Sequence, residues 1–168
     1  DLPSFPTRRS SDLFSIHLTS GVVSLSLALD YESLPFYLLT VIASDTNGGM
    51  AQTILNVSVV DQNDSPAFVG APFAAQIDEN QVNGSTVLKL TATDQDAGDL
   101  LTFSIAGSDH FALSSSGRIT TTKILDFESV NTYTLSISVS DGKTSVTEAI
   151  TISVRDTNDS PVFVNSPY

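Results

Sequence analysis

The sequence contains no cysteine and no tryptophan, and only 7 of its 168 residues are lysine or arginine. The absence of cysteine excludes disulfides, thiolate metal sites and cysteine nucleophiles. The 19 acidic residues bring the net charge to −12, which repels nucleic acid and anionic membrane surfaces. No apolar run approaches the ~20 residues that a membrane-spanning helix needs. Hydrophobic residues still make up 40% of the chain, enough to build a core.

The common catalytic motifs are absent as well. The sequence has no G-x-S-x-G elbow, no P-loop and no H-E-x-x-H. Paired carboxylates can hydrolyse glycosides, but here they recur at repeated positions and do not belong to a single cleft. We therefore expect no enzymatic activity and no small-molecule substrate.

Short acidic landmarks repeat along the chain. DQNDSPAF at 61–68 returns as DTNDSPVF at 156–163, and LDYE at 29–32 returns as LDFE at 125–128. ASD at 43–45 also returns, as VSD at 139–141. Because the order is kept at a nearly constant offset, residues from 14 onward make up one and a half copies of a unit of about 95 residues.

The local hydrophobic pattern is that of β-strands. Residues 132–140 alternate apolar with small polar side chains, the period of a strand with one buried face. We predict seven strands in the second copy, at 73–79, 86–93, 101–106, 111–114, 118–123, 132–140 and 146–155. The first copy has four, at 14–17, 22–27, 36–44 and 51–60. The expected fold is all-β, a tandem seven-strand Greek-key β-sandwich whose first repeat is truncated to about four strands.

The first thirteen residues differ from the rest. They read DLPSFPTRRSSDL and resemble one reading frame of a short-read sequencing adapter, DLHSFPTRRSSDL, from which only Pro3 differs. The repeat correspondence also stops at Phe14. We therefore interpret residues 1–13 as an adapter artefact and exclude them from the predicted fold.

Five motifs of the second copy together resemble the extracellular repeats of the cadherin superfamily. The family's xEx, DxD, LDxE, xDx and DxNDx motifs correspond, in order, to residues 78–80, 94–96, 125–128, 140–142 and 156–160. The resemblance covers residues 14–168. It predicts the C-terminal half of a repeat at 14–66, a complete repeat at 67–161 and the start of another at 162–168.

This resemblance implies calcium bound where one repeat meets the next. Ca²⁺ takes six to eight oxygen ligands, and without a cation the gathered carboxylates repel one another. The ligands implied for the first junction are Asp30, Glu32, Asp61, Gln62 (backbone), Asn63, Asp64, Ser65 (backbone), Asp94, Asp96 and Asp141. Those implied for the second are Glu79, Asp126, Glu128, Asp156, Thr157 (backbone), Asn158, Asp159 and Ser160 (backbone).

One loop departs from the family pattern. Residues 94–100 look about two residues shorter than the animal form and lack its asparagine, so we hypothesise that Asp99 supplies a side-chain oxygen in its place. Zn²⁺ fits poorly because there is no cysteine and because His17 and His110 occupy non-equivalent positions. Mg²⁺ fits less well than Ca²⁺ because the ligand sets are large and rich in carboxylates.

The function that the resemblance implies is calcium-dependent cell adhesion by calcium-rigidified extracellular repeats, homophilic in the parent protein. The expected partners are other cadherin-like repeats in cis or trans. The expected location is the extracellular side of the plasma membrane, with anchoring through other parts of the parent protein. The alternative is a spacer or ligand-binding module of a large surface protein, of microbial or other origin.

Overall fold

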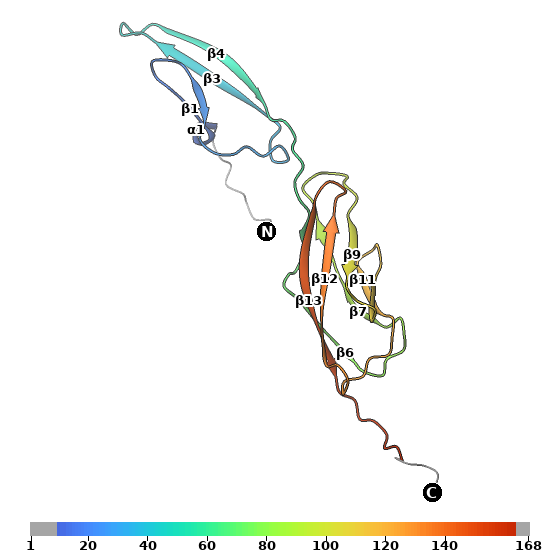
Figure 1. Cartoon of the computed structure of the whole chain (residues 1–168). Coiled ribbons are helices and arrows are strands. Elements are labelled where there is room, and N and C mark those ends of the chain that lie inside the picture. Colours follow the sequence, from blue (N-terminus) through green and yellow to red (C-terminus); the bar gives the residue numbers. More distant parts are fainter. Residues whose placement is uncertain (1–9, 164–168) are drawn as a thin grey trace, which may run out of the picture. The chain divides into compact units, whose positions relative to one another are not determined.

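The computed structural model describes residues 10–163, and every regular element in this range except a short helix, α1 (Ser10–Leu13), is a β-strand. The predicted all-β class is confirmed, although α1 was not predicted. No helix among these residues has the length and apolar character needed to span a bilayer. The chain divides between Gln62 and Asn63 into two compact units, called unit 1 and unit 2 below (Figure 1).

Unit 1 consists of two antiparallel strand pairs, β1 with β2 and β3 with β4. All four predicted strands are present, as β1 (Phe14–Ile16), β2 (Val23–Leu25), β3 (Phe36–Ser44) and β4 (Met50–Ser58). The rings of Phe14 and Tyr37 meet edge to face, 5.2 Å apart, and link β1 to β3. Leu13 is the only buried residue in the described part of unit 1. Its backbone oxygen accepts a hydrogen bond from the Ser26 N–H. The described part of unit 1 therefore encloses no apolar core of its own.

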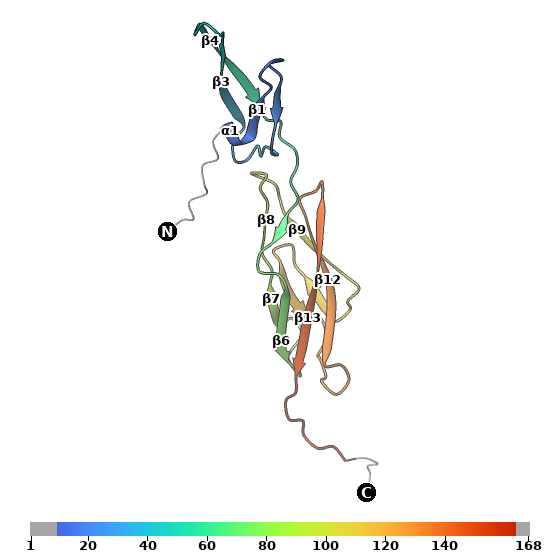
Figure 2. The ribbon, with the colours of Figure 1, turned by 90° about the vertical axis from the view of Figure 1, so that its left-hand side faces the viewer.

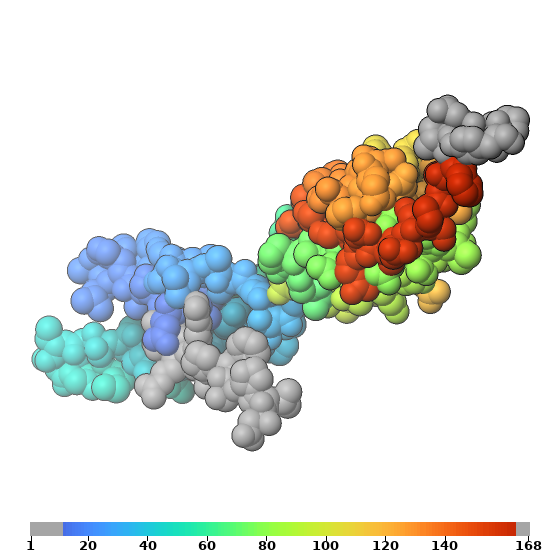
Figure 3. Space-filling view, turned by 90° about the horizontal axis from the view of Figure 1, so that it is seen from below, coloured from blue at the N-terminus to red at the C-terminus, as the bar shows by residue number. Residues whose placement is uncertain are grey.

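Unit 2 contains the complete sandwich. Its strands are β5 (Ala67–Phe68), β6 (Phe73–Asp78), β7 (Thr86–Lys89), β8 (Ala92–Thr93), β9 (Thr102–Ala106), β10 (Phe111–Leu113), β11 (Arg118–Thr121), β12 (Thr132–Ser140) and β13 (Ser145–Arg155). One sheet has the order β6-β13-β12-β9 and the other β10-β11-β7, while β5 pairs with β8 (Figure 2). Within the first sheet β6 runs parallel to β13, although the two strands are far apart in the sequence. In the space-filling view, red atoms from the C-terminal part of unit 2 lie against green atoms from its N-terminal part (Figure 3).

The two sheets of unit 2 enclose a single apolar core. Its fully or almost fully buried members are Ile77, Leu90, Phe111, Ile119, Leu125, Leu135, Ile137, Ile150, Ile152 and Val154. Along β12 the buried Leu135, Ile137 and Val139 alternate with small polar residues, as the period-2 pattern predicts. Burial of this inward face drives the pairing of the two sheets.

Two details of unit 2 differ from the sequence-based prediction. The expected strand at 86–93 is split into β7 and β8, because the Leu90 N–H leaves the strand ladder and donates to the Gly117 carbonyl at 2.7 Å. The short strand β5 was not predicted, and it pairs with β8 at Ala67–Thr93 and Phe68–Ala92. The other six predicted strands are present.

Candidate metal centre

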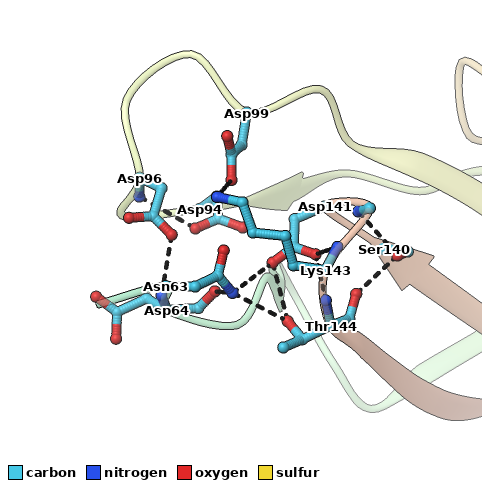
Figure 4. A network of polar contacts seen from close by, with 10 residues as sticks. Asn63, Asp64, Asp94, Asp96, Asp99, Ser140, Asp141, Lys143 and Thr144 are labelled. Carbon is cyan, nitrogen blue, oxygen red and sulfur yellow. Dashed lines mark hydrogen bonds and ion pairs between the residues drawn. The ribbon is translucent and has the colours of Figure 1, made fainter. Parts of the chain in front are cut away.

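The strand register of unit 2 brings acidic residues together at both ends of its four-stranded sheet. The turn between β12 and β13 lies at one end, and Thr102 at the start of β9 pairs with Ser140 beside it. This end holds what we call the Asp141 cluster: Asp94, Asp96, Asp99 and Asp141, with Asn63 and Asp64 (Figure 4). At the other end, where β6 and β13 finish together, lies the Glu79 cluster: Glu79, Asp126, Glu128, Asp156 and Asp159.

Asp141 is the most enclosed acid of its cluster, with 9% of its surface exposed. One carboxylate oxygen accepts the N–H groups of Lys143 (2.7 Å) and Thr144 (2.6 Å). The other accepts the Asn63 amide and the Thr144 hydroxyl, both at 2.9 Å. Burial tends to raise the pKa of Asp141, but the hydrogen bonds from Asn63, Thr144 and Lys143 outweigh it and hold the pKa well below its ordinary value. Asp141 is therefore a fixed negative charge.

The loop after β8 supplies the other carboxylates of this cluster. Asp94 Oδ1 accepts the Asp96 N–H at 3.1 Å, and Asp96 Oδ2 accepts the Asp64 N–H at 2.9 Å. The second oxygen of Asp94, Oδ2, is buried and has no hydrogen-bond partner among the described residues. A buried carboxylate oxygen without a donor is costly, and a bound cation removes that cost.

The spacing of the carboxylates suits one hard cation. Asp94, Asp99 and Asp141 each offer an oxygen, and these oxygens lie within 4.8 Å of one another. Because Ca²⁺ binds oxygen at 2.3–2.6 Å, two ligands of the same ion lie no more than about 5 Å apart. Lys143 also enters this cluster, with its Nζ atom 3.2 Å from Asp99 Oδ2.

The Glu79 cluster is built around an almost fully buried carboxylate. Glu79 is 1% exposed, and its two oxygens accept the N–H groups of Thr157 and Phe127, each at 2.8 Å. Glu79, Asp126 and Glu128 place carboxylate oxygens within 4.8 Å of one another. Glu79 thus ties the loop before β12 to the segment after β13 and lies beside the acids of that loop.

The carboxylates of the Glu79 cluster repel one another, and this repulsion affects Glu128. A hydrogen bond to its own backbone lowers the pKa of Glu128, but poor solvation and the charges of Glu79, Asp156 and Asp159 raise it above its ordinary value overall. Asp159 Oδ1 in turn accepts a hydrogen bond from the Asn80 amide at 3.0 Å. A divalent cation here would relieve the mutual repulsion of these carboxylates.

The LDxE motif adopts the same local geometry in both units. In unit 1 the Asp30 carboxylate accepts hydrogen bonds from the Ser33 hydroxyl (2.8 Å) and the Ser33 N–H (3.2 Å), which lower its pKa. In unit 2 the Asp126 carboxylate accepts the matching bonds from Ser129, at 2.8 and 3.1 Å, and its pKa is lowered for the same reason. Each aspartate is therefore held in a fixed position at the start of a turn.

The structure gathers most of the predicted ligands of unit 2 into these two clusters. Other predicted residues contact their neighbours in the chain: the Asn158 amide donates to the Asp159 carbonyl at 3.1 Å, and the Gln62 amide donates to the Asp61 carbonyl at 2.7 Å. Ser65 and Ser160 follow the acidic stretches and are exposed. The predicted ligands of unit 1, Asp30, Glu32, Asp61 and Gln62, stay predictions.

Sequence reasoning missed two residues that contact the Asp141 cluster, Lys143 and Thr144. Thr144 lies three residues after Asp141, a spacing at which a side chain can cap a turn, and it donates to Asp141 through both its N–H and its hydroxyl. Lys143 occupies the position of Asn47 in the first copy of the repeat. Aligning the two copies around the xDx motif shows that asparagine is replaced by lysine here, but not which residue the lysine contacts.

Comparison with known proteins identifies the fold. The cadherin domain family model matches residues 73–155. Mouse Protocadherin Fat 4 is 38% identical over 92% of this chain, and human Cadherin EGF LAG seven-pass G-type receptor 1 is 34% identical over 99% of it. This chain spans only 3% and 6% of those two proteins, respectively.

Solved structures agree with the sequence comparison. The structure of human Protocadherin-24 EC1-2 superimposes with a TM-score of 0.64 at 26% identity, covering 90% of this chain and 80% of that one. Protocadherin Gamma B7 extracellular cadherin domains 1-4 give 0.63 at 31% identity, covering 88% of this chain and 39% of that one. With the strand order of unit 2 and the family match, these likenesses show that the chain belongs to the cadherin superfamily and that residues 73–155 form a cadherin domain.

Proposed function

We propose that this chain is a calcium-binding segment of an extracellular cadherin-type adhesion protein. The observation that carries the proposal is the buried, unpartnered Asp94 Oδ2, which lies in a group of three carboxylates spaced for one cation. Ca²⁺ would supply the positive charge that lets these acids stay close together when ionised.

In unit 2 the proposed ligands come from both clusters. Asp94, Asp96, Asp99 and Asp141 would hold one ion or more at one end of the sheet. Glu79, Asp126, Glu128, Asp156 and Asp159 would do so at the other. Support comes from the enclosed position of Asp141 and Glu79 and from the raised pKa of Glu128, which reports crowding of like charges. Stiffening of the junction between repeats by calcium stays a prediction from the sequence.

Adhesion is proposed for the parent protein, of which this chain represents a small part. The support is its similarity to protocadherins and related proteins of mouse, human and fruit fly. The partners we propose are other cadherin-like repeats, in a homophilic contact, at the extracellular side of the plasma membrane. The chain itself would then act as a calcium-stabilised link in a longer array.

Thermal unfolding of the full chain in chelator and in millimolar calcium tests the calcium proposal. At a calcium concentration about 100 times Kd, binding adds ~2.7 kcal/mol, which corresponds to a rise in Tm of about 5–10 °C for a chain of this size. Magnesium at the same concentration should raise Tm less. An unchanged Tm in millimolar calcium would overturn the proposal.

A matched pair of variants locates the effect. Asp94→Asn removes a charge from the Asp141 cluster and should reduce the rise in Tm with calcium. Asp109→Asn removes a charge outside both clusters, from an exposed aspartate that pairs with Lys123 at 2.6 Å, and should leave that rise unchanged. Equal calcium responses of the two variants would exclude Asp94 as a ligand.

A further inference from the structure

Lys143 places a positive charge inside the Asp141 cluster. It lies two residues after Asp141 in the turn between β12 and β13, and Figure 4 shows its side chain extending from the turn to Asp99. The Nζ atom is 3.2 Å from Asp99 Oδ2. The Asp99 side chain is 23% exposed, so the ion pair is partly shielded from water. The ammonium thus meets one of the three carboxylates whose spacing suits a cation.

The turn itself does not require a lysine. In unit 1 the matching turn begins at Asp45, whose Oδ1 atom accepts the N–H of Asn47 at 2.8 Å. In unit 2 Asp141 Oδ1 accepts the N–H of Lys143 in the same way, at 2.7 Å. The backbone contact is therefore the same with an uncharged residue and with a lysine. What Lys143 adds is its ammonium group.

We infer that the Lys143 ammonium is a built-in counter-ion of the Asp94–Asp99–Asp141 group and competes there with calcium. This inference rests on the proposed calcium function. Lysine suits the role because its ammonium is a compact charge on a flexible stem, able to occupy a carboxylate site and to leave it. The consequence is a cluster that is partly neutralised without metal and that binds calcium more weakly than its carboxylates alone would.

The two effects of the lysine have opposite signs. With calcium absent, Lys143 offsets part of the repulsion among three carboxylates and stabilises the folded state. With calcium present, an ion bound to Asp99 must approach or displace the ammonium, so binding is opposed. Asp94 Oδ2 has no donor even with Lys143 in place, so a cation can still gain a ligand in this cluster.

The test compares the full chain with Lys143→Asn, which copies the residue of unit 1, and with Lys143→Arg, which keeps the charge. Calcium binding is measured by isothermal titration calorimetry, and Tm is measured in chelator. For Lys143→Asn we expect the Kd of the weakest resolved calcium site to fall by about tenfold or more, since a unit charge roughly 5 Å from the ion is removed. Its Tm in chelator should fall, whereas Lys143→Arg should follow the wild type in both measurements.

Each result decides the inference. If Lys143→Asn leaves both calcium affinity and the Tm in chelator unchanged while the wild type binds calcium, the inference fails and the proposed function stands. If neither protein binds calcium, the proposed function fails, and a lower Tm of Lys143→Asn in chelator would still identify Lys143 as the counter-ion. If Lys143→Arg behaves like Lys143→Asn, the effect is not one of charge and the inference is overturned.

Discussion

At the scale of single residues, Glu79 and Glu128 represent two physical types of acid. Glu79 is enclosed and accepts two backbone N–H groups, so its charge is part of the folded architecture. Glu128 is exposed, and surrounding acids raise its pKa. The first type stabilises the unit without metal, and the second strains it. Removing each should therefore have opposite consequences in chelator.

Glu79→Ala should lower the free energy of unfolding by about 2–4 kcal/mol, because the N–H groups of Phe127 and Thr157 lose a charged acceptor. Urea denaturation in chelator measures this loss. The neighbouring Asp78→Ala serves as the control: Asp78 is partly exposed and pairs with Arg155 at 2.7 Å, so it should cost no more than about 1 kcal/mol. Equal losses for the two variants would contradict the role given to Glu79.

Glu128→Gln should gain stability relative to the wild type as the pH rises. Because the pKa of Glu128 in the folded state is raised above its ordinary value of 4.5, the folded state binds its proton more tightly than the unfolded state does. The wild type therefore loses stability as the pH increases beyond 4.5, and the variant lacks this loss. The difference in Tm between variant and wild type, measured in chelator at about pH 4 and pH 7, should grow with pH. A Tm difference that is the same at both pH values would contradict the raised pKa of Glu128.

At the scale of elements, the sequence predicted those strands whose alternating residues place one face in the apolar core. β12 was predicted in full because its alternating side chains match its buried and exposed positions. β5 and β8 are two residues each, too short for any period, and the Val69 N–H donates to the Thr91 carbonyl at 2.9 Å beside their pairing. Such contacts depend on the tertiary fold and leave no local pattern.

The candidate site also contains residues that the sequence predicted and one that it did not. Its carboxylates were found from the sequence because they recur in repeated motifs. Lys143 was not, because a lysine in a turn can point in many directions and only the placement of Asp99 on a neighbouring loop gives it a partner. Charge placement across loops is thus a property of the folded chain.

Gly117 is the glycine on which the split between β7 and β8 depends. It has a φ of +82°, its carbonyl accepts the Leu90 N–H, and an added Cβ would lie 2.5 Å from the Leu90 oxygen. Gly117→Ala should therefore destabilise unit 2 by about 3 kcal/mol or more, from both backbone strain and this clash. Gly107→Ala, at a φ of +72° with open space around it, should cost only about 1–2 kcal/mol. Urea denaturation measures the free energy of unfolding of both variants. Equal losses of stability would contradict the close approach of Gly117 to the Leu90 oxygen.

At the scale of the whole molecule, the two units differ in how much core they contain. Unit 2 encloses its apolar residues between two sheets, whereas the apolar side chains of β3 and β4 are at best half-buried. β3 and β4 correspond to β12 and β13, which in unit 2 pair on their outer edges with β9 and β6. Unit 1 has no such partners among its described residues, so its strand edges are open.

A fragment limited to residues 14–66 should therefore show no cooperative thermal unfolding by circular dichroism, because it cannot bury enough apolar surface to offset the cost of ordering the chain. A fragment covering residues 63–163 should unfold cooperatively. A sigmoidal transition from the shorter fragment would show that residues 14–66 fold independently and would contradict this prediction.

NMR can locate the calcium that we propose binds the two acidic clusters of unit 2. Calcium titrated into the ¹⁵N-labelled full chain should shift the amide signals of residues 94–99 and 141–144 at one end, and of 79–80, 126–128 and 156–159 at the other. Signals from the core strands between them should move little. Calcium-induced shifts confined to residues outside these segments, or no shifts at millimolar calcium, would contradict the account.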